Sequence, residues 1–244
     1  MTALPYRLMD DRRVRLGLIV LQADETCEDE LHQILPSETS LLVSRIRSGT
    51  DVTPESLAEM EGRLSDAASL FPVGAKFDAL GYACTSATAQ IGADKVAANI
   101  RAGTQTDCVT DPVTALVAAC SALGISKLAL VSPYVETVSE RLRITLLTDG
   151  IETPVFASFV VAEEALVARI DPASVADAAR AMIDGTNVDG LFLSCTNLRT
   201  IPVIAGLEAE LDVPVLSSNL VLAWHMLTLA GRLPPGTRPS ALLT

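Results

Sequence analysis

The sequence has few of the residues that usually mark metal-binding, disulfide-rich and nucleic-acid-binding proteins. It contains only two histidines and no Cys-x-x-Cys pair, so we expect no metal. Five cysteines are an odd number, and with no secretory signal a disulfide framework is not expected. Aromatic residues make up only 4%, and 30 acidic against 18 basic residues give a net charge of −12. Such a chain repels polyanions and offers few stacking platforms, so we expect no nucleic-acid partner.

No segment is apolar enough to cross a membrane. A membrane-spanning helix needs roughly 18 to 20 uninterrupted apolar residues, and no run approaches that length. Residues 1–15 are charged and contain no apolar segment of the kind found in secretory signals. With 49% hydrophobic residues among 244, the chain can still build a large core. We expect a soluble, cytoplasmic protein with no membrane partner.

The sequence does contain an internal repeat, which centres on two cysteines. An apolar run over residues 77–83 ends at Cys84, and a second run over 188–194 ends at Cys195, at an offset of 195 − 84 = 111; threonine follows each cysteine. The same offset relates residues 16–20 to 127–131 and 25–26 to 136–137, and an offset of 107 relates 109–110 to 216–217. Matches in the same order indicate two copies of one α/β unit, each with a cysteine at the carboxyl end of an equivalent strand.

Hydrophobic periodicity predicts the same order of elements in both units. The expected strands cover residues 14–20, 39–47, 77–83 and 108–110, then 127–132, 153–161, 188–194 and 213–217. The expected helices cover residues 27–35, 53–70, 86–100, 111–123, 136–147, 172–184, 202–211 and 219–230, with an irregular tail from 233. The predicted fold class is α/β, with two pseudo-symmetric flavodoxin-like lobes, each a mainly parallel sheet of about four strands flanked by helices.

The lobes are expected to follow the repeat. Residues 1–111 form the N-terminal lobe, which the C-terminal helical segment 219–244 completes, and residues 112–218 form the C-terminal lobe. No linker-like stretch separates the two, so they should pack closely. Because ligands of open α/β sheets bind outside the carboxyl ends of the strands, we expect the active site in the cleft between the lobes.

The positions of Cys84 and Cys195 predict the chemistry of this cleft. Cys84 lies at a strand end and at the amino end of a helix, where the dipole and free N–H groups favour a thiolate and a bound carboxylate. With a thiol on each side of a substrate, a proton beside a carboxylate can leave on one face and return on the other. Alternatively, one thiolate can add to an activated double bond while the other thiol donates a proton. Neither route requires a cofactor.

The loop after the first strand carries two acidic residues, Asp24 and Glu25. Because the loop lies at the same edge of the sheet, both carboxylates are candidates for contact with a substrate. Asp24 or Thr26 is equally well interpreted as the N-cap of the helix that opens around Cys27. The sequence leaves both interpretations open.

Five stretches, at residues 17–20, 82–86, 133–134, 194–195 and 214–217, resemble in order the landmarks of the Asp/Glu racemase superfamily. Within it the chain resembles the maleate cis-trans isomerase and arylmalonate decarboxylase-like branch, and most closely the ectoine-utilisation proteins. The resemblance implies a homodimer or higher homo-oligomer. It also implies that Cys84 and Cys195 are the catalytic pair and that the substrate carboxylate is held by Thr85, Ser86, Thr196 and Tyr134. Arylmalonate decarboxylases keep only the second thiol, so two thiols favour isomerisation or racemisation.

The chain departs from the maleate isomerase pattern at two positions, and both concern the end of the substrate opposite to the carboxylate described above. Asp24 and Glu164 stand where maleate isomerases carry asparagines that help to bind the second carboxylate. An acid in place of a neutral donor repels a second carboxylate in a poorly solvated cleft, whereas it attracts an ammonium or amidinium group. A dicarboxylate is therefore a poor candidate, and Asp24 and Glu164 are expected to contact a nitrogen-bearing group.

These features together predict a cofactor-independent two-cysteine isomerase or racemase. It would act at a carbon next to a carboxylate of a small, nitrogen-bearing substrate, as in ectoine or hydroxyectoine catabolism. The alternatives are a maleate cis-trans isomerase, an arylmalonate-type decarboxylase and, from another class, a non-catalytic small-ligand binding protein.

Overall fold

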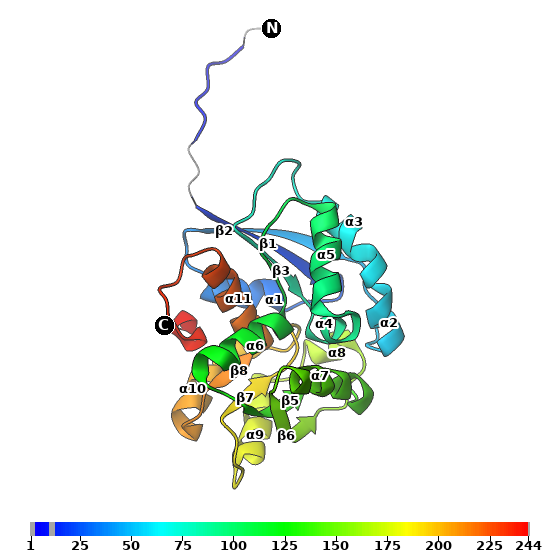
Figure 1. Cartoon of the computed structure of the whole chain (residues 1–244), viewed down its shortest axis with the longest axis vertical. Coiled ribbons are helices and arrows are strands. Elements are labelled where there is room, and N and C mark those ends of the chain that lie inside the picture. Colours follow the sequence, from blue (N-terminus) through cyan, green and yellow to red (C-terminus); the bar gives the residue numbers. More distant parts are fainter. Residues whose placement is uncertain (1–2, 10–12, 244) are drawn as a thin grey trace.

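The computed structural model describes residues 3–9 and 13–243 as two parallel sheets covered by helices (Figure 1). The first sheet has the strand order β2 (Thr39–Ile46), β1 (Val14–Leu21), β3 (Ala79–Ala83), β4 (Val109–Thr110). The second has the order β6 (Glu152–Ser158), β5 (Lys127–Ser132), β7 (Gly190–Leu193), β8 (Val215–Ser217). All strand pairs are parallel, and the two orders are the same. The predicted α/β fold with two four-stranded parallel sheets is confirmed.

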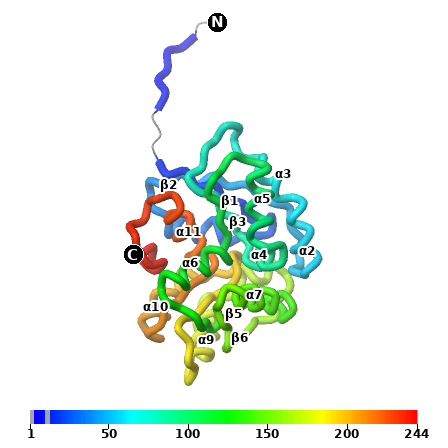
Figure 2. Tube along the Cα trace, viewed as in Figure 1, coloured from blue at the N-terminus to red at the C-terminus, as the bar shows by residue number. Residues whose placement is uncertain are grey.

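Helices follow the strands in both halves of the chain. In the first half they are α1 (Cys27–Ile34), α2 (Pro54–Glu59), α3 (Leu64–Ser69), α4 (Thr85–Ile91), α5 (Ala93–Gly103) and α6 (Pro112–Leu123). In the second half they are α7 (Glu136–Thr148), α8 (Glu164–Val167), α9 (Pro172–Ile183), α10 (Ile201–Leu211) and α11 (Ser218–Leu229). Residues 3–9 extend away from the body of the chain (Figure 2). Within the described residues, no helix is long and apolar enough to cross a membrane.

Three sequence predictions of single elements were wrong. The helix expected over 53–70 is divided into α2, a 3₁₀ turn η1 (Glu61–Arg63) and α3; Gly62, a poor helix former, lies in that turn. The helix expected over 86–100 is divided at Gly92, whose φ of 97° is incompatible with an α-helix. The tail expected to be irregular contains a 3₁₀ helix, η2 (Pro239–Leu243).

The two sheets exchange their covering helices. Helix α6 follows the first sheet, yet its Val113 and Leu116 share a core cluster with Leu128 and Phe192 of the second sheet. Helix α11 follows the second sheet but packs on β3 of the first, so closely that a Cβ on Gly81 would lie 2.7 Å from Met226 Sδ. We therefore propose to keep the lobe boundaries 1–111 with 219–244, and 112–218, because each lobe then contains the helix that packs on its own sheet.

Candidate active site

One small cavity lies at the carboxyl ends of the strands, between the two sheets. Its lining includes all eight residues expected at the site, together with Leu21 and Asn197: Asp24, Cys84, Thr85, Ser86, Tyr134, Glu164, Cys195 and Thr196. The volume open to the centre of a water-sized sphere is about 10 Å³, which is room for about one water molecule. The chemistry-bearing side chains of both lobes are thus brought together and shielded from bulk water.

The position of Cys84 is fixed by its strand and its helix. It follows β3 and is the N-cap of α4, where its Sγ accepts a hydrogen bond from the Ala87 amide at 3.3 Å. Burial nevertheless raises the pKa of the Cys84 thiol to about 12, because desolvation disfavours the thiolate more than the Ala87 N–H stabilises it. The helix end thus acts on Cys84 in the expected direction, but desolvation in the buried cavity has the larger effect.

Cys195 has an unusual backbone conformation. It follows β7 with a φ of 114°, a region that non-glycine residues rarely adopt and that often marks functional sites. Its amide donates to Ser218 Oγ at 2.9 Å, and its Sγ accepts from the Asn197 amide at 3.3 Å. Burial, and next the Glu164 carboxyl, raise the pKa of this thiol well above its usual value.

Tyr134 and Glu164 form one hydrogen-bonded line with the second thiol. Tyr134 Oη lies 2.9 Å from Cys195 Sγ and 3.0 Å from Glu164 Oε1. The other carboxylate oxygen, Glu164 Oε2, accepts from Asn197 Nδ2 at 2.9 Å. Burial raises the pKa of the Glu164 carboxyl, the hydrogen bonds from Asn197 and Tyr134 oppose this, and nearby Asp24 adds to it.

Asp24 accepts hydrogen bonds at the start of α1 and also lines the cavity. Its Oδ1 accepts the amides of Thr26 and Cys27, both at 2.8 Å, at the start of α1. Its Oδ2 is buried and has no hydrogen-bond partner among the described residues, and the residue lines the cavity. Glu25, the other candidate in this loop, is exposed, forms an ion pair with Arg169 at 3.0 Å and does not line the cavity.

The sequence analysis missed two buried polar residues: Asn197, which lines the cavity, and Glu30, which does not. Asn197 links the Glu25 loop to the start of α8, because its Oδ1 accepts the Glu25 amide at 2.8 Å while its Nδ2 donates to both the backbone and the side chain of Glu164. Glu30, only 1% exposed, accepts hydrogen bonds from the amides of Thr200 and Ile201 and from Asn219 Nδ2. The position of Asn197 directly after Cys-Thr was a signal for the first; a glutamate in a helix gave none for the second.

The cavity is acidic and contains no basic side chain. No lysine, arginine or histidine is among its described lining residues, whereas Asp24 and Glu164 both are. Burial also raises the pKa of Asp24. Among the described residues, no cluster of three or more His, Cys, Asp or Glu side chains could hold a metal ion.

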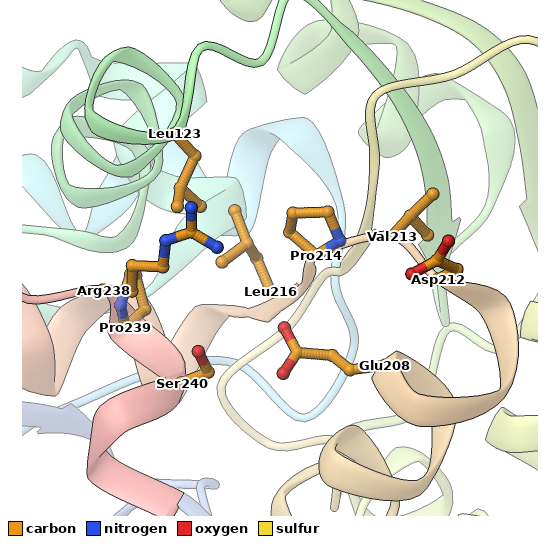
Figure 3. Close-up of a pocket in the computed structure, with 9 residues that line it drawn as sticks. All are labelled: Leu123, Glu208, Asp212, Val213, Pro214, Leu216, Arg238, Pro239 and Ser240. Atoms are coloured by element: carbon orange, nitrogen blue, oxygen red, sulfur yellow. The ribbon is translucent and has the colours of Figure 1, made fainter.

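A roomier pocket, of about 230 Å³ by the same measure, lies at the opposite end of β8 (Figure 3). Glu208, Asp212 and Arg238 lie around it, together with apolar side chains such as Leu123 and Leu216. Glu208 Oε1 accepts the Val215 amide at 3.0 Å and so fixes the start of β8. The pocket contains no thiol and lies away from the carboxyl ends of the strands, so it is not the candidate active site.

Comparisons with known proteins identify the family of the chain. Residues 16–238 match the sequence model of the arylmalonate decarboxylase family. The chain is 28% identical to a maleate isomerase of Pseudomonas putida over 228 residues, 87% of this chain and 90% of the relative. It is 34% identical to the arylmalonate decarboxylase of Bordetella bronchiseptica over 119 residues, 48% of this chain and 50% of the relative.

Solved structures resemble the whole chain. The maleate isomerase Iso from Pseudomonas putida S16, as a cysteine-to-alanine mutant with maleate, has a TM-score of 0.81 at 28% identity and covers 95% of this chain and 98% of its own. The Nocardia farcinica maleate cis-trans isomerase, as a cysteine-to-serine mutant with a covalently bound succinylcysteine intermediate, has a TM-score of 0.78 at 28% identity, covering 94% and 97%.

Proposed function

The chain belongs to the arylmalonate decarboxylase family, and we propose that it is one of the isomerases of that family. In this proposal Cys84 and Cys195 act on a carbon next to the carboxylate of a small substrate, and no cofactor takes part. The observation that carries the proposal is that the two thiols, one from each half of the repeat, line a single closed cavity. The relative with a covalently bound succinylcysteine supports cysteine chemistry in this fold.

We assign the substrate carboxylate to a group of backbone amides. The N–H groups of Thr85, Ser86 and Thr196 donate to no acceptor in the described part of the chain, and all three residues line the cavity. Two of their hydroxyls are hydrogen-bonded within the protein: Thr85 Oγ1 to Ser218 Oγ at 2.8 Å, and Thr196 Oγ1 to the Ala83 carbonyl oxygen, which it donates to at 3.2 Å. Free amides from both lobes can therefore hold one carboxylate between the thiols.

We assign a nitrogen-bearing group to the other end of the substrate. Asp24 Oδ2 is buried and forms no hydrogen bond among the described residues, although the nearby Thr196 side chain helps to lower the pKa of Asp24. No basic side chain of the lining would neutralise a second substrate carboxylate. An N–H or ammonium group satisfies Asp24 Oδ2. Ectoine and hydroxyectoine have such a group, and the likeness to ectoine-utilisation proteins stays a prediction, as do a cytoplasmic location and a homo-oligomeric state.

The geometry allows two routes for the two thiols. In the first, one thiolate removes the proton next to the carboxylate and the opposite thiol protonates the other face. In the second, one thiolate adds to a carbon–carbon double bond and the opposite thiol protonates the neighbouring carbon. After rotation about the resulting single bond, the thiolate left by that transfer removes the proton again, the C–S bond breaks and the double bond is restored. Both routes need one thiolate and one thiol at the same time, and both conserve atoms without an oxidant.

Maleate isomerisation and arylmalonate decarboxylation are the two alternative reactions, because the relatives carry those names. Maleate isomerisation would require Asp24 and Glu164 to be protonated beside the second carboxylate. Decarboxylation of a phenylmalonate would release carbon dioxide and would depend on Cys195 alone. A non-catalytic binding protein would bind its ligand without exchanging any substrate hydrogen.

Proton NMR in deuterium oxide tests the proposal. Hydroxyectoine, ectoine, maleate, aspartate and a phenylmalonate are incubated with the native protein and with Cys84→Ser, Cys195→Ser and Cys108→Ser; Cys108, which does not line the cavity, is the matched control. We expect exchange or isomerisation of one nitrogen-bearing compound, lost by about a hundredfold or more in the two cavity variants and retained in the control. Equal turnover in all four proteins would overturn the proposal.

A further inference from the structure

We propose that Glu164 acts through Tyr134 as a positioning residue that keeps Cys195 protonated and so makes the two thiols of the cavity unequal. Glu164 was expected to contact the substrate, yet both of its carboxylate oxygens are occupied by protein donors. Its effect must therefore pass through the groups that it touches. The consequence for catalysis rests on the proposed function, but the protonation of Cys195 can be measured without any substrate.

The orientation of Asn197 fixes one side of Glu164. Asn197 Oδ1 accepts the Glu25 amide and its Nδ2 donates to the Glu164 carbonyl, so the amide cannot be turned over without losing both hydrogen bonds. Consequently an N–H group faces Glu164 Oε2 at 2.9 Å, and this oxygen acts as an acceptor. A proton on the Glu164 carboxyl therefore belongs on Oε1, which faces Tyr134.

The Tyr134 hydroxyl has a single proton for two neighbours. It lies 3.0 Å from Glu164 Oε1 and 2.9 Å from Cys195 Sγ and can donate to only one of them. An ionised carboxylate is a far stronger acceptor than a thiol sulfur, so while Glu164 is ionised the proton points to Oε1. The remaining lone pair of Tyr134 then accepts the S–H of Cys195, and the thiol stays a thiol.

The same line reverses when Glu164 is protonated. Oε1–H then donates to Tyr134 Oη, and the Tyr134 hydroxyl donates to Cys195 Sγ, which is the arrangement that stabilises a thiolate. Because the one Tyr134 proton can be donated to only one of its two neighbours, an ionised Glu164 disfavours a Cys195 thiolate. Burial and the Glu164 carboxyl raise the pKa of Cys195, whereas a hydrogen bond donated by Tyr134 to the sulfur lowers it, so the direction in which the Tyr134 proton points matters for this thiol.

Cys84 is not part of the hydrogen-bonded line of Glu164, Tyr134 and Cys195. Its Sγ accepts from the Ala87 amide and has no hydrogen bond to Tyr134 or Glu164. The charged groups that face Glu164 are Asp24 and the two thiols, and Glu164 and Asp24 act on both thiols through space. With Cys195 held as the proton donor, Cys84 is the thiol left to serve as base or nucleophile in either route.

The experiment follows the ¹³Cβ chemical shifts of the cysteines with pH in the ¹³C-cysteine-labelled full chain, because this shift reports ionisation of each thiol. Five signals are assigned with single Cys→Ser variants. In Glu164→Gln we expect the ionisation of Cys195 to begin at least about one pH unit lower than in the native protein, a roughly tenfold larger thiolate fraction, with a clearly smaller change at Cys84.

Two further variants separate the hydrogen-bonded line from a simple charge effect. Asp24→Asn removes the other carboxyl of the cavity, which has no hydrogen bond to the line, and should move both thiols slightly and alike. In a Tyr134→Phe background, Glu164→Gln should move Cys195 no more than Cys84. Equal shifts of both thiols in Glu164→Gln, no shift, or a rise for Cys195 would overturn the proposal, whatever the substrate of the protein.

Discussion

Replacement of Glu30 should destabilise the contact between the two lobes far more than replacement of its exposed neighbour Asp29. Glu30 projects from α1 of the first lobe and accepts hydrogen bonds from the Thr200 amide at 2.5 Å, the Ile201 amide at 2.9 Å and Asn219 Nδ2 at 2.7 Å. It thereby caps the start of α10 in the second lobe. Asn219 also donates to the carbonyl of Thr196, beside Cys195.

The size of the effect follows from the donors left behind. Glu30→Ala leaves three N–H donors, two of them buried, and the Thr200 hydroxyl without this acceptor. Each buried donor left unpaired costs about 1 to 3 kcal/mol, whereas removal of a carboxylate that burial disfavours offsets part of the loss. We expect a net loss of about 3 kcal/mol in the free energy of unfolding. Glu30→Gln keeps the oxygen that receives both amides but turns an NH₂ group toward Asn219, so it should lose about 1 to 2 kcal/mol.

Urea unfolding measures these differences, with the fluorescence of Trp224, the single tryptophan, as one signal and circular dichroism as the other. The matched control is Asp29→Ala, which removes an ion pair with Arg199 across the same two lobes. That pair is long, at 3.4 Å, and the Asp29 side chain is 62% exposed, so its loss should cost about 0 to 1 kcal/mol. If Glu30→Ala and Asp29→Ala were equally stable, the assignment of Glu30 as the buried contact between the lobes would be refuted.

Three further predictions concern packing, pH and substrate selection. Gly81→Ala should lower the free energy of unfolding by about 1 to 3 kcal/mol, because its Cβ would lie 2.7 Å from Met226 Sδ and 3.2 Å from Leu222. The control Gly206→Ala, with open space around the new Cβ, should be neutral or slightly stabilising. Equal effects in urea unfolding would contradict the packing of α11 on β3. Burial raises the pKa of Glu30 in the folded protein above its usual 4.5, so the folded state binds this proton more tightly than the unfolded state. The stability advantage of the native protein over Glu30→Gln should therefore shrink as the pH rises above about 4.5 toward the raised pKa, and a difference that stays constant would contradict this. Asp24→Asn should weaken the binding of a nitrogen-bearing substrate by roughly tenfold or more and improve the binding of a dicarboxylate. Isothermal titration calorimetry with both compounds measures the two affinities. If their ratio does not change, Asp24 serves only to cap the start of α1.

Much of the architecture follows from the sequence alone. The inner strands β1, β3, β5 and β7 are short apolar runs, and burial on both faces of a parallel sheet imposes that pattern locally. The repeat at a fixed offset then implies equal strand orders in both halves, and the ends of the strands locate Cys84 and Cys195. The points at which helices are interrupted could not be predicted from the sequence, because nothing in the local pattern distinguishes Gly92, which has a positive φ, from a glycine tolerated inside a helix.

The contacts between residues far apart in the chain were decided only by the tertiary structure. Glu30 meets Thr200 at a separation of 170 residues and Asn219 at 189, and hydrophobic periodicity carries no information about such polar pairs. The exchange of α6 and α11 between the sheets likewise depends on how the lobes close on each other. The same closure removes water from the cavity, and because desolvation outweighs a helix end, it raises the pKa of the Cys84 thiol that the sequence alone would have lowered.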